Sequence, residues 1–291
     1  MNGIIFINPF GVPKESVYQA ERLQEEFLKF NVQATIDYHG YLKNSILHGN
    51  ISNDLNCDFA IYLDKDKYLS ACLEKKGVRI FNKHSAIRVC DDKGATYIAL
   101  SDSGIKMPDT IFAPVCYDKS LQLDIGDLRE IGEKLGFPLI IKESYGSMGK
   151  GVYKADNESE LIEIAERLKN TAHLYQRYIG NRVGVDVRMI VIGGKFVCSM
   201  IRENKADFRS NVALGGKGTM YKPSDKFISV AEKCAEILGL DYCGVDLLFG
   251  EDDTPYVCEV NSNAFIGEIE RVTGVNVARK YAEYVIKTIG K

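Results

Sequence analysis

Short apolar runs alternate with longer amphipathic segments over the first 85 or so residues of the chain. The short runs are rich in β-branched and aromatic residues, as strands are, and the longer segments repeat apolar positions at a helical period. The predicted strands are GIIFINP, NVQATID, CDFAIYLD and VRIFN, and the predicted helices run from Ser16 to about Phe30 and over DKYLSACLEKKG. Strands that alternate with helices in this way are typical of a small parallel α/β layer.

The pattern changes along the rest of the chain. One long helix is predicted over SAIRVCDDKGATYIALSDSG, because Gly104 ends it and Pro108 follows. Helices and strands then mix, and strands dominate from His173 onward. We expect an α/β fold with α+β subdomains, divided into residues 1–85, 86–172 and 173–291.

Two apolar segments near the C-terminal end, CGVDLLFG and YVCEVNSN, are joined by EDDTP, which predicts a β-hairpin. With a four-residue loop from Glu251 to Thr254, Asp246 falls opposite Glu259. Asn261 lies two residues further on, and therefore on the same face of its strand as Glu259. Like charges opposite one another destabilise a sheet, and a hard cation would remove the repulsion. The three oxygen-bearing side chains therefore predict a Mg²⁺ site.

A simpler explanation of this hairpin stays open. The polar face of an antiparallel hairpin commonly meets water. The pairing also depends on the assumed loop, since a one-residue bulge would separate Asp246 from Glu259. A second site is needed to decide between the two explanations.

The segment SYGSMGKG places Gly146, Gly149 and Gly151 between two predicted strands. It lacks the residue order and the following helix that a P-loop or a Rossmann turn needs. A glycine-rich loop between strands lets backbone N–H groups approach phosphates, and Lys142 just upstream could reach the same phosphates. A flexible hairpin with a surface lysine is the alternative. Together with the predicted metal site, the loop favours nucleotide binding.

Composition excludes several other classes of function. The net charge is −3 with no block of Lys or Arg, which argues against a nucleic-acid partner. No apolar run approaches the roughly 20 residues that cross a bilayer, so no membrane association is expected. The eight cysteines show no CxxC pairing and the four histidines are scattered. We therefore expect reduced thiols, a cytoplasmic location and no zinc site.

With these two sites in hand, the chain from about Asn82 to its C-terminus resembles the RimK-like glutamate ligases of the ATP-grasp superfamily. The motifs that carry the resemblance are DDKGATYIALSDSGIKMP, PLIIKESYGSMGKGV, LYQRYIGNRVGVDVRMIVIGGK, DFRSNVALGG, CGVDLLF, CEVNSN and GEIERVTGVNVA. The resemblance implies an ATP-grasp fold with a parallel α/β domain in front of it. It also implies an ATP-dependent ligase that joins a carboxylate to an amine through an acyl-phosphate.

The resemblance assigns a role to each matching residue. The residues that would contact ATP are Lys93, Lys142, Gly146, Ser147, Gly149, Gly151, Gln176, Arg177, Tyr178, Asp186, Arg209, Ser210 and Asn211. Asp186 would lie near the ribose, and Arg177 with Tyr178 would border the adenine. The residues that would act on the transferred phosphate are Lys142, Arg202 and Arg209. The ligands of Mg²⁺, or of Mn²⁺ in its place, would be Asp246, Glu259 and Asn261.

These residues also have structural explanations. Lys93 lies in a polar stretch of a predicted helix, where a lysine is often solvated. Arg202 and Arg209 could form surface ion pairs, which contribute little stability. Arg188, on the same strand face as Asp186, could simply pair with it.

Two departures from the family pattern bear on the substrates. Arg177 stands where related proteins often carry an acid, and SNAFIGE follows the hairpin in place of a Ser-Pro-Gly run. The expected partners are ATP, a carboxylate and an amine, with glutamate the natural guess for the amine. The acceptor could be a protein, a peptide or a metabolite, and the oligomeric state is open. An ATP-grasp kinase-like phosphotransferase and a non-catalytic ATP-binding regulator are the alternatives.

Overall fold

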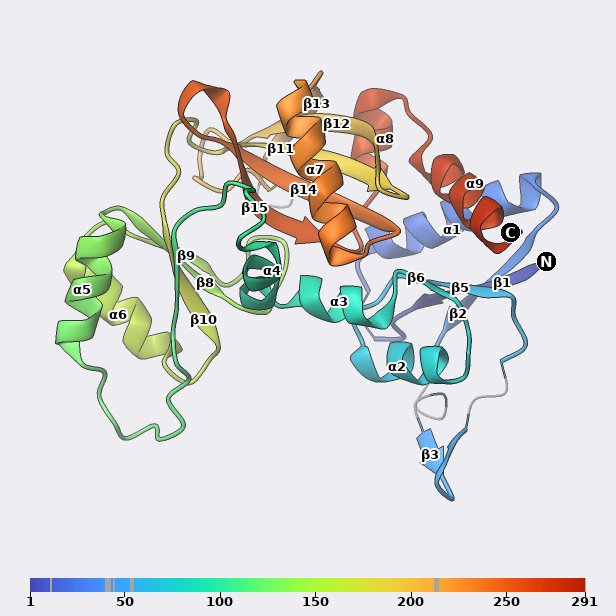
Figure 1. Ribbon diagram of the computed structural model, residues 1–291, viewed down its shortest axis with the longest axis horizontal. Helices are drawn as coiled ribbons and strands as arrows, with labels where there is room; N and C mark the ends of the chain where they lie inside the picture. Colours follow the sequence, from blue (N-terminus) through green and yellow to red (C-terminus); the bar gives the residue numbers. More distant parts are fainter. Residues whose placement is uncertain (11, 40–42, 44, 53–54, 212–214, 291) are drawn as a thin grey trace.

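Three sheets of four or five strands organise the protein in the computed structural model, which describes all residues except 11, 40–42, 44, 53–54, 212–214 and 291 (Figure 1). The strands are β1 (Asn2–Ile7), β2 (Gln33–Tyr38), β3 (Ser45–Leu47), β4 (Asn50–Ser52), β5 (Phe59–Tyr62), β6 (Ile80–Phe81), β7 (Thr110–Phe112), β8 (Leu139–Glu143), β9 (Val152–Ala155), β10 (His173–Arg177), β11 (Val185–Ile192), β12 (Lys195–Glu203), β13 (Lys217–Met220), β14 (Tyr242–Phe249) and β15 (Pro255–Asn261). The helices are α1 (Lys14–Lys29), α2 (Lys67–Lys75), α3 (His84–Asp91), α4 (Lys93–Leu100), α5 (Ile125–Leu135), α6 (Glu158–Leu168), α7 (Asp225–Leu238), α8 (Gly267–Thr273) and α9 (Val277–Ile289). None of the helices described is both long and apolar enough to cross a membrane.

The N-terminal sheet has the strand order β2-β1-β5-β6 and is parallel throughout. The predicted α/β layer is therefore confirmed. The expectation that Ser16 caps its first helix is wrong, because α1 begins at Lys14 and Ser16 lies in its first turn. Pro13 occupies the N-cap position, and its carbonyl accepts the Ser16 N–H. Pro13 thus replaces the serine as the residue that starts the helix.

The single long helix predicted before Gly104 is also wrong, since two helices, α3 and α4, occupy this segment. Asp92 between them adopts an extended backbone, with φ −102° and ψ 110°. Its side chain accepts the backbone N–H of Ala95 and so caps the second helix. The break has a functional consequence, because it makes Lys93 the first residue of α4.

The middle lobe consists of the sheet β7-β10-β8-β9 with helices α5 and α6, at the left of Figure 1. Its buried residues form a cluster of their own, which includes Leu139, Ile141, Leu161 and Tyr175. The strands are antiparallel, with β10 between β7 and β8. The glycine-rich segment connects β8 to β9 at the end of this sheet.

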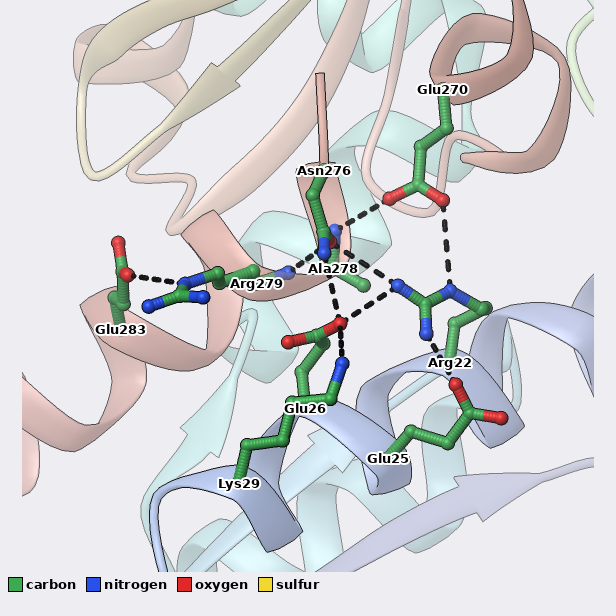
Figure 2. Close-up of polar contacts among 9 residues, drawn as sticks. All are labelled: Arg22, Glu25, Glu26, Lys29, Glu270, Asn276, Ala278, Arg279 and Glu283. Atoms are coloured by element: carbon green, nitrogen blue, oxygen red, sulfur yellow. Dashed lines mark hydrogen bonds and ion pairs between the residues drawn. The ribbon is translucent and has the colours of Figure 1, made fainter. Parts of the chain in front are cut away.

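The C-terminal sheet, β13-β12-β11-β14-β15, is antiparallel and shares a hydrophobic core with the N-terminal sheet. Phe59 of β5 and Tyr242 of β14 both belong to this shared cluster. Helix α1 packs beside α9, and Figure 2 shows the charged contacts at their junction. There Glu26 Oε1 accepts hydrogen bonds from Arg22, Lys29 and Asn276, at 2.7–2.9 Å.

The hairpin of β14 and β15 confirms the pairing of Asp246 with Glu259, although by a different route from the one expected. Next to the loop, Phe249 rather than Gly250 lies opposite Pro255. The register then shifts at Cys258, an extra residue on β15, so that Asp246 again faces Glu259. The loop between the strands is one residue longer than expected, and the bulge at Cys258 compensates for this extra residue. A bulge had been expected to separate Asp246 from Glu259, whereas this one brings them into register.

Candidate active site

A cavity lies between the middle lobe and the C-terminal sheet. The middle lobe contributes the glycine-rich loop, Lys142 of β8 and the end of β10. The C-terminal sheet contributes side chains from β11, β12, β14 and β15. We call it the first cavity.

Most of the residues expected to bind ATP, to act on it or to bind Mg²⁺ line this cavity. They are Lys93, Lys142, Gly146, Ser147, Gly149, Gln176, Arg177, Tyr178, Asp186, Arg202, Arg209, Ser210, Asn211, Asp246 and Glu259. Gly151 and Asn261 are outside its lining. Gly151 lies at the base of the loop with φ +69°, where a Cβ atom would come within 2.9 Å of the Glu143 side chain. Asn261 lines a second cavity, which is described below.

Charged side chains form a row across four strands of the C-terminal sheet. Arg202 of β12 lies opposite Asp186 of β11, and Arg188 of β11 lies opposite Asp246 of β14. Glu259 of β15 continues the row opposite Asp246. Cross-strand neighbours lie close enough for their side chains to interact directly. The row therefore alternates cations and carboxylates up to its last two members, which are both acids.

Two arginines hold Asp246. Arg188 donates from Nε to Oδ1 at 2.8 Å and from Nη2 to Oδ2 at 2.7 Å. Arg202 Nη2 lies 2.9 Å from Asp246 Oδ2 and also donates to Asp186. Burial alone would raise the pKa of Asp246, but the two guanidinium groups outweigh it and hold that pKa below its usual value. Two consequences follow. The repulsion between Asp246 and Glu259 does not by itself require a metal ion, and Arg188 pairs with Asp246 rather than with Asp186.

Arg202 is the most deeply buried of these cations, with 3% of its side chain exposed. The expectation that it could be a surface ion pair is wrong, since it bridges two buried carboxylates. Burial would lower the pKa of the guanidinium, and Asp186 and Asp246 raise it instead. Arg202 thus carries a permanent positive charge at the bottom of the first cavity.

Lys93 and Lys142 approach the cavity from the side of the middle lobe and are both buried. Lys93 Nζ donates to the carbonyl of Gly146 at 2.9 Å and lies 4.0 Å from a Glu259 oxygen. Burial lowers the pKa of Lys93, and Glu259 opposes the shift. Lys142 Nζ lies 3.8 Å from the Sγ of Cys258, the bulge residue. The solvated position considered for Lys93 is therefore wrong.

Arg209 ties the glycine-rich loop to the C-terminal half of the chain. Its Nη1 donates to the carbonyl of Gly149 at 2.9 Å, while Asp207 accepts from Nε and Nη2. Gly146, whose carbonyl accepts from Lys93, and Gly149, whose carbonyl accepts from Arg209, both have positive φ angles. Lys93 and Arg209 thus hold the loop from opposite sides.

The Arg177 guanidinium is held by residues outside the cavity lining. Its Nε donates to Asp109 Oδ2 at 2.8 Å and its Nη2 to the carbonyl of Lys134 at 2.9 Å. The positive charge of Arg177, which stands where related proteins often carry an acid, is therefore paired with Asp109. Its backbone remains beside Gln176 and Tyr178 in the cavity wall.

The residues expected to bind a metal ion fit that role in part. Asp246 and Glu259 face one another, and 27% of the Glu259 side chain is exposed. The buried Nδ2 of Asn261 has no hydrogen-bond partner among the described residues, so it is a donor for a ligand, whereas a cation would be bound by the Oδ1 of the same amide. Within the described part of the chain, no three His, Cys, Asp or Glu side chains cluster as a metal site. Two carboxylates with an amide suit a cation that completes its coordination with water and phosphate oxygens.

A second, larger cavity adjoins the first. Ser147, Arg202, Asn211 and Glu259 line both. Sequence reasoning did not place Arg188 in the site, although it lines the second cavity and holds Asp246. The signal was its position two residues after Asp186 on one strand face, which was interpreted only as a possible pair.

Residues 90–285 match the RimK-like ATP-grasp domain family. The chain belongs to this family. The resemblance drawn from the motifs is therefore confirmed. ATP-grasp ligases use ATP with divalent metal ions and bind a carboxylate and an amine substrate.

Several curated relatives are similar over most of this chain. A probable alpha-L-glutamate ligase of Maridesulfovibrio salexigens is 36% identical over 217 residues, 74% of this chain and 69% of the relative. Beta-citrylglutamate synthase B of Danio rerio is 32% identical over 228 residues, 78% of this chain and 55% of the relative. N-acetylaspartylglutamate synthase A of Homo sapiens is 29% identical over 232 residues, 79% of this chain and 58% of the relative. The chain thus spans little more than half the length of these two synthases.

Solved structures confirm the fold. D-alanine–D-alanine ligase from Bacillus anthracis, complexed with ATP, superimposes with a TM-score of 0.75 and 20% identity, covering 99% of this chain and 97% of that one. A RimK domain ATP-grasp protein from Sphaerobacter thermophilus gives a TM-score of 0.73 and 20% identity, over 98% of this chain and 100% of that one. The expected ATP-grasp architecture, with the parallel sheet included, is therefore confirmed.

Proposed function

We propose that this protein is an ATP- and Mg²⁺-dependent ligase that joins a carboxylate to an amine, with glutamate or another amino acid as the amine. The observation that carries the proposal is the junction of the two cavities. Arg202, Asn211 and Glu259 border both, so a phosphate in the first cavity and an acid in the second would meet at the same residues. A protein that only binds ATP has no need of the second cavity.

The proposed reaction has two steps. A carboxylate oxygen of the acid attacks the γ-phosphorus of ATP, the bond to the bridging oxygen breaks, and ADP leaves. The amine nitrogen then attacks the carbonyl carbon of the acyl-phosphate, inorganic phosphate leaves, and the nitrogen loses a proton to give the amide. Both steps depend on positioning and on neutralising phosphate charge, so no side chain has to become a nucleophile.

Each charged residue has a proposed part in this reaction. Lys93, Lys142 and Arg209 neutralise the phosphates while the backbone of the glycine-rich loop covers them. Arg202 keeps a positive charge beside the transferred group, and Arg188 orients Asp246. Asp246, Glu259 and Asn261 would hold Mg²⁺. When bound, the ion would supply positive charge that offsets the negative charge of the phosphates.

The remaining assignments are proposals on the same footing. From the resemblance, Asp186 would lie near the ribose and Gln176, Arg177 and Tyr178 beside the adenine, and the presence of all four in the lining of the first cavity supports this proposal. The chain is divided into an N-terminal domain over 1–85 and two ATP-grasp lobes over 86–172 and 173–291. A cytoplasmic location agrees with eight cysteines that are all free thiols.

The test is an assay for ADP and phosphate release with ATP, MgCl₂ and paired panels of acids and amines. A ligase releases both products only when an acid and an amine are present, and its organic product carries no phosphate. A phosphorylated acid that survives to mass spectrometry would favour the phosphotransferase. Tight ATP binding with no turnover across both panels would favour the regulator.

A further inference from the structure

The second cavity opens at a position in the N-terminal sheet where ligands commonly bind. Strand β1 pairs with β2 on one side and with β5 on the other, so the chain reverses its direction across the sheet at β1. Crevices at the carboxyl ends of such strands are the usual binding sites of open α/β sheets. Asn8 follows β1 and Asp64 follows β5, and both line the cavity. Its opposite end is the charged row at Arg202 and Glu259.

Large apolar side chains from four separate segments line this cavity. We call Phe10, Tyr18, Met148 and Phe265 the apolar wall. Phe10 is 65% exposed, Tyr18 42% and Met148 36%, so all three keep part of their surface accessible. Met148 belongs to the glycine-rich loop, which brings part of the wall next to the phosphate-binding side of the site.

Phe265 is held in the wall by its neighbours along the chain. Ala264 and Ile266 are buried in the core shared by the two sheets, so the residue between them is turned toward the cavity. The Ala264 carbonyl accepts the buried hydroxyl of Tyr242 at 2.6 Å. The loop therefore presents its aromatic ring from a fixed backbone, which lowers the entropic cost of binding an apolar group.

The charges of the cavity are balanced. Four cationic and four acidic side chains line it, namely Lys14, Lys65, Arg188 and Arg202 against Glu15, Asp64, Glu259 and Glu268. Both arginines are engaged by carboxylates of the chain, and Lys65 pairs with Asp91 at 2.8 Å. Of these four cations only Lys14, which is exposed, has neither an ion pair nor a side-chain hydrogen bond with the described residues. An acid with several carboxylates would therefore find few cations free to receive its additional charges.

We infer that the second cavity binds a carboxylic acid with an apolar or aromatic frame, whose single carboxylate is the group that reacts. The carboxylate lies at the Arg202 and Glu259 end, and the frame packs against the apolar wall. This inference rests on the proposed ligase function and specifies the class of acid that it uses.

The experiment uses hydroxylamine in place of the unidentified amine. Hydroxylamine attacks an acyl-phosphate and gives a hydroxamate, which forms a coloured iron(III) complex, so each acid can be tested alone with ATP and MgCl₂. The panel contrasts 3-phenylpropionate and hexanoate with succinate and citrate, using the full chain. We expect kcat/KM to be at least about tenfold higher for the apolar acids, because the loss of apolar contacts in a binding pocket commonly lowers kcat/KM by about that factor.

Variants of the wall test its role directly. Phe265→Ala and Tyr18→Ala should each raise KM for 3-phenylpropionate about tenfold and leave KM for ATP unchanged. Phe265→Leu should recover part of the loss. Tyr117→Ala is the matched control, because Tyr117 is a 95% exposed aromatic residue outside both cavities. If Phe265→Ala does not fold, Tyr18→Ala, at an exposed position, gives the same comparison.

The outcomes separate this inference from the proposed function. Higher kcat/KM with citrate or succinate than with the apolar acids would overturn the inference and leave the ligase intact. Wall variants that lower the rates of all acids equally would overturn it too. No ADP and no hydroxamate with any acid would count against the ligase function itself, and the inference would fall with it.

Discussion

Two buried clusters of charge in this protein are built from similar residues but lie in different surroundings. In the first, Arg188 and Arg202 hold Asp246 at the junction of the two cavities. In the second, shown in Figure 2, Arg22 and Lys29 hold Glu26 between α1 and α9. Asp246 and Glu26 both have lowered pKa values although both are buried. A buried carboxylate with a lowered pKa therefore does not by itself indicate an active site, and the adjoining cavity distinguishes the two clusters.

The contacts of the Glu26 cluster join α1 to the C-terminal helices. Arg22 on α1 reaches Glu270 on α8 at 3.8 Å, and Asn276 just before α9 donates to Glu26. The cluster thus fastens the first helix of the N-terminal domain to the last helices of the chain (Figure 2).

The largest effect is expected from Glu259→Gln. This change keeps the shape of the side chain and removes a charge that Mg²⁺ needs, so turnover should fall roughly a thousandfold. The Glu259 side chain is partly exposed, and its ion pair with Lys93 is long, at 4.0 Å. The melting temperature should therefore stay within a few degrees of that of the parent protein. ADP release and thermal denaturation measure the two effects. Full turnover would exclude Glu259 as a metal ligand.

The second prediction concerns Arg188→Lys, which keeps the charge but loses the two-pronged contact with Asp246. A lysine cannot reproduce a planar fork, so Asp246 should be poorly oriented and turnover should fall roughly ten- to a hundredfold. Raising MgCl₂ should recover part of the activity if the loss lies in metal binding. Arg129→Lys is the control, because Arg129 makes a similar contact with Glu158 on the exposed surface. Equal rates for both variants would contradict the proposed role of Arg188.

The third prediction concerns the Glu26 cluster, where a substitution should lower stability and leave turnover nearly unchanged. Glu26→Gln leaves Arg22 and Lys29 without their buried partner and should lower the free energy of unfolding by about 2 kcal/mol. Turnover by the folded protein should be nearly unchanged, since Glu26 lines neither cavity. Chemical denaturation measures the loss, with the exposed Glu21→Gln on the same helix as control. A variant as stable as the parent would show that the cluster contributes no net stability.

The smallest effect is the pH dependence of the same cluster. Burial would raise the pKa of Glu26, but Asn276, Lys29 and Arg22 lower it to about 2. An unfolded glutamate titrates near pH ~4.3, so this stabilisation is present above that pH and is lost as the pH falls toward 2. Denaturation curves at stepped pH should show a shallower acid decline for Glu26→Gln than for the parent protein. Parallel curves would assign the acid sensitivity to other groups.

Sequence reasoning could predict the parts of the site that depend on neighbours along the chain. Asn261 lies beyond Glu259 on the same strand face because strand side chains repeat every two residues, whereas Asp246 faces Glu259 because the bulge at Cys258 compensates the longer loop. The glycine-rich loop lies between strands because apolar runs flank it on both sides. It could not predict the break at Asp92, where a side chain caps a new helix inside a continuous helical pattern.

The chain by itself thus determined the family and most of the order of its strands and helices, and it predicts which residues bind ATP. Only the tertiary structure decided which arginine holds which acid, since Arg188 could have paired with either Asp186 or Asp246. Only the tertiary structure brought Asn8, Phe10 and residues 12–18 against residues 261–268 to form the second cavity. Periodicity reports the local geometry of the backbone, whereas contacts between segments some 250 residues apart depend on how the helices and sheets between them pack.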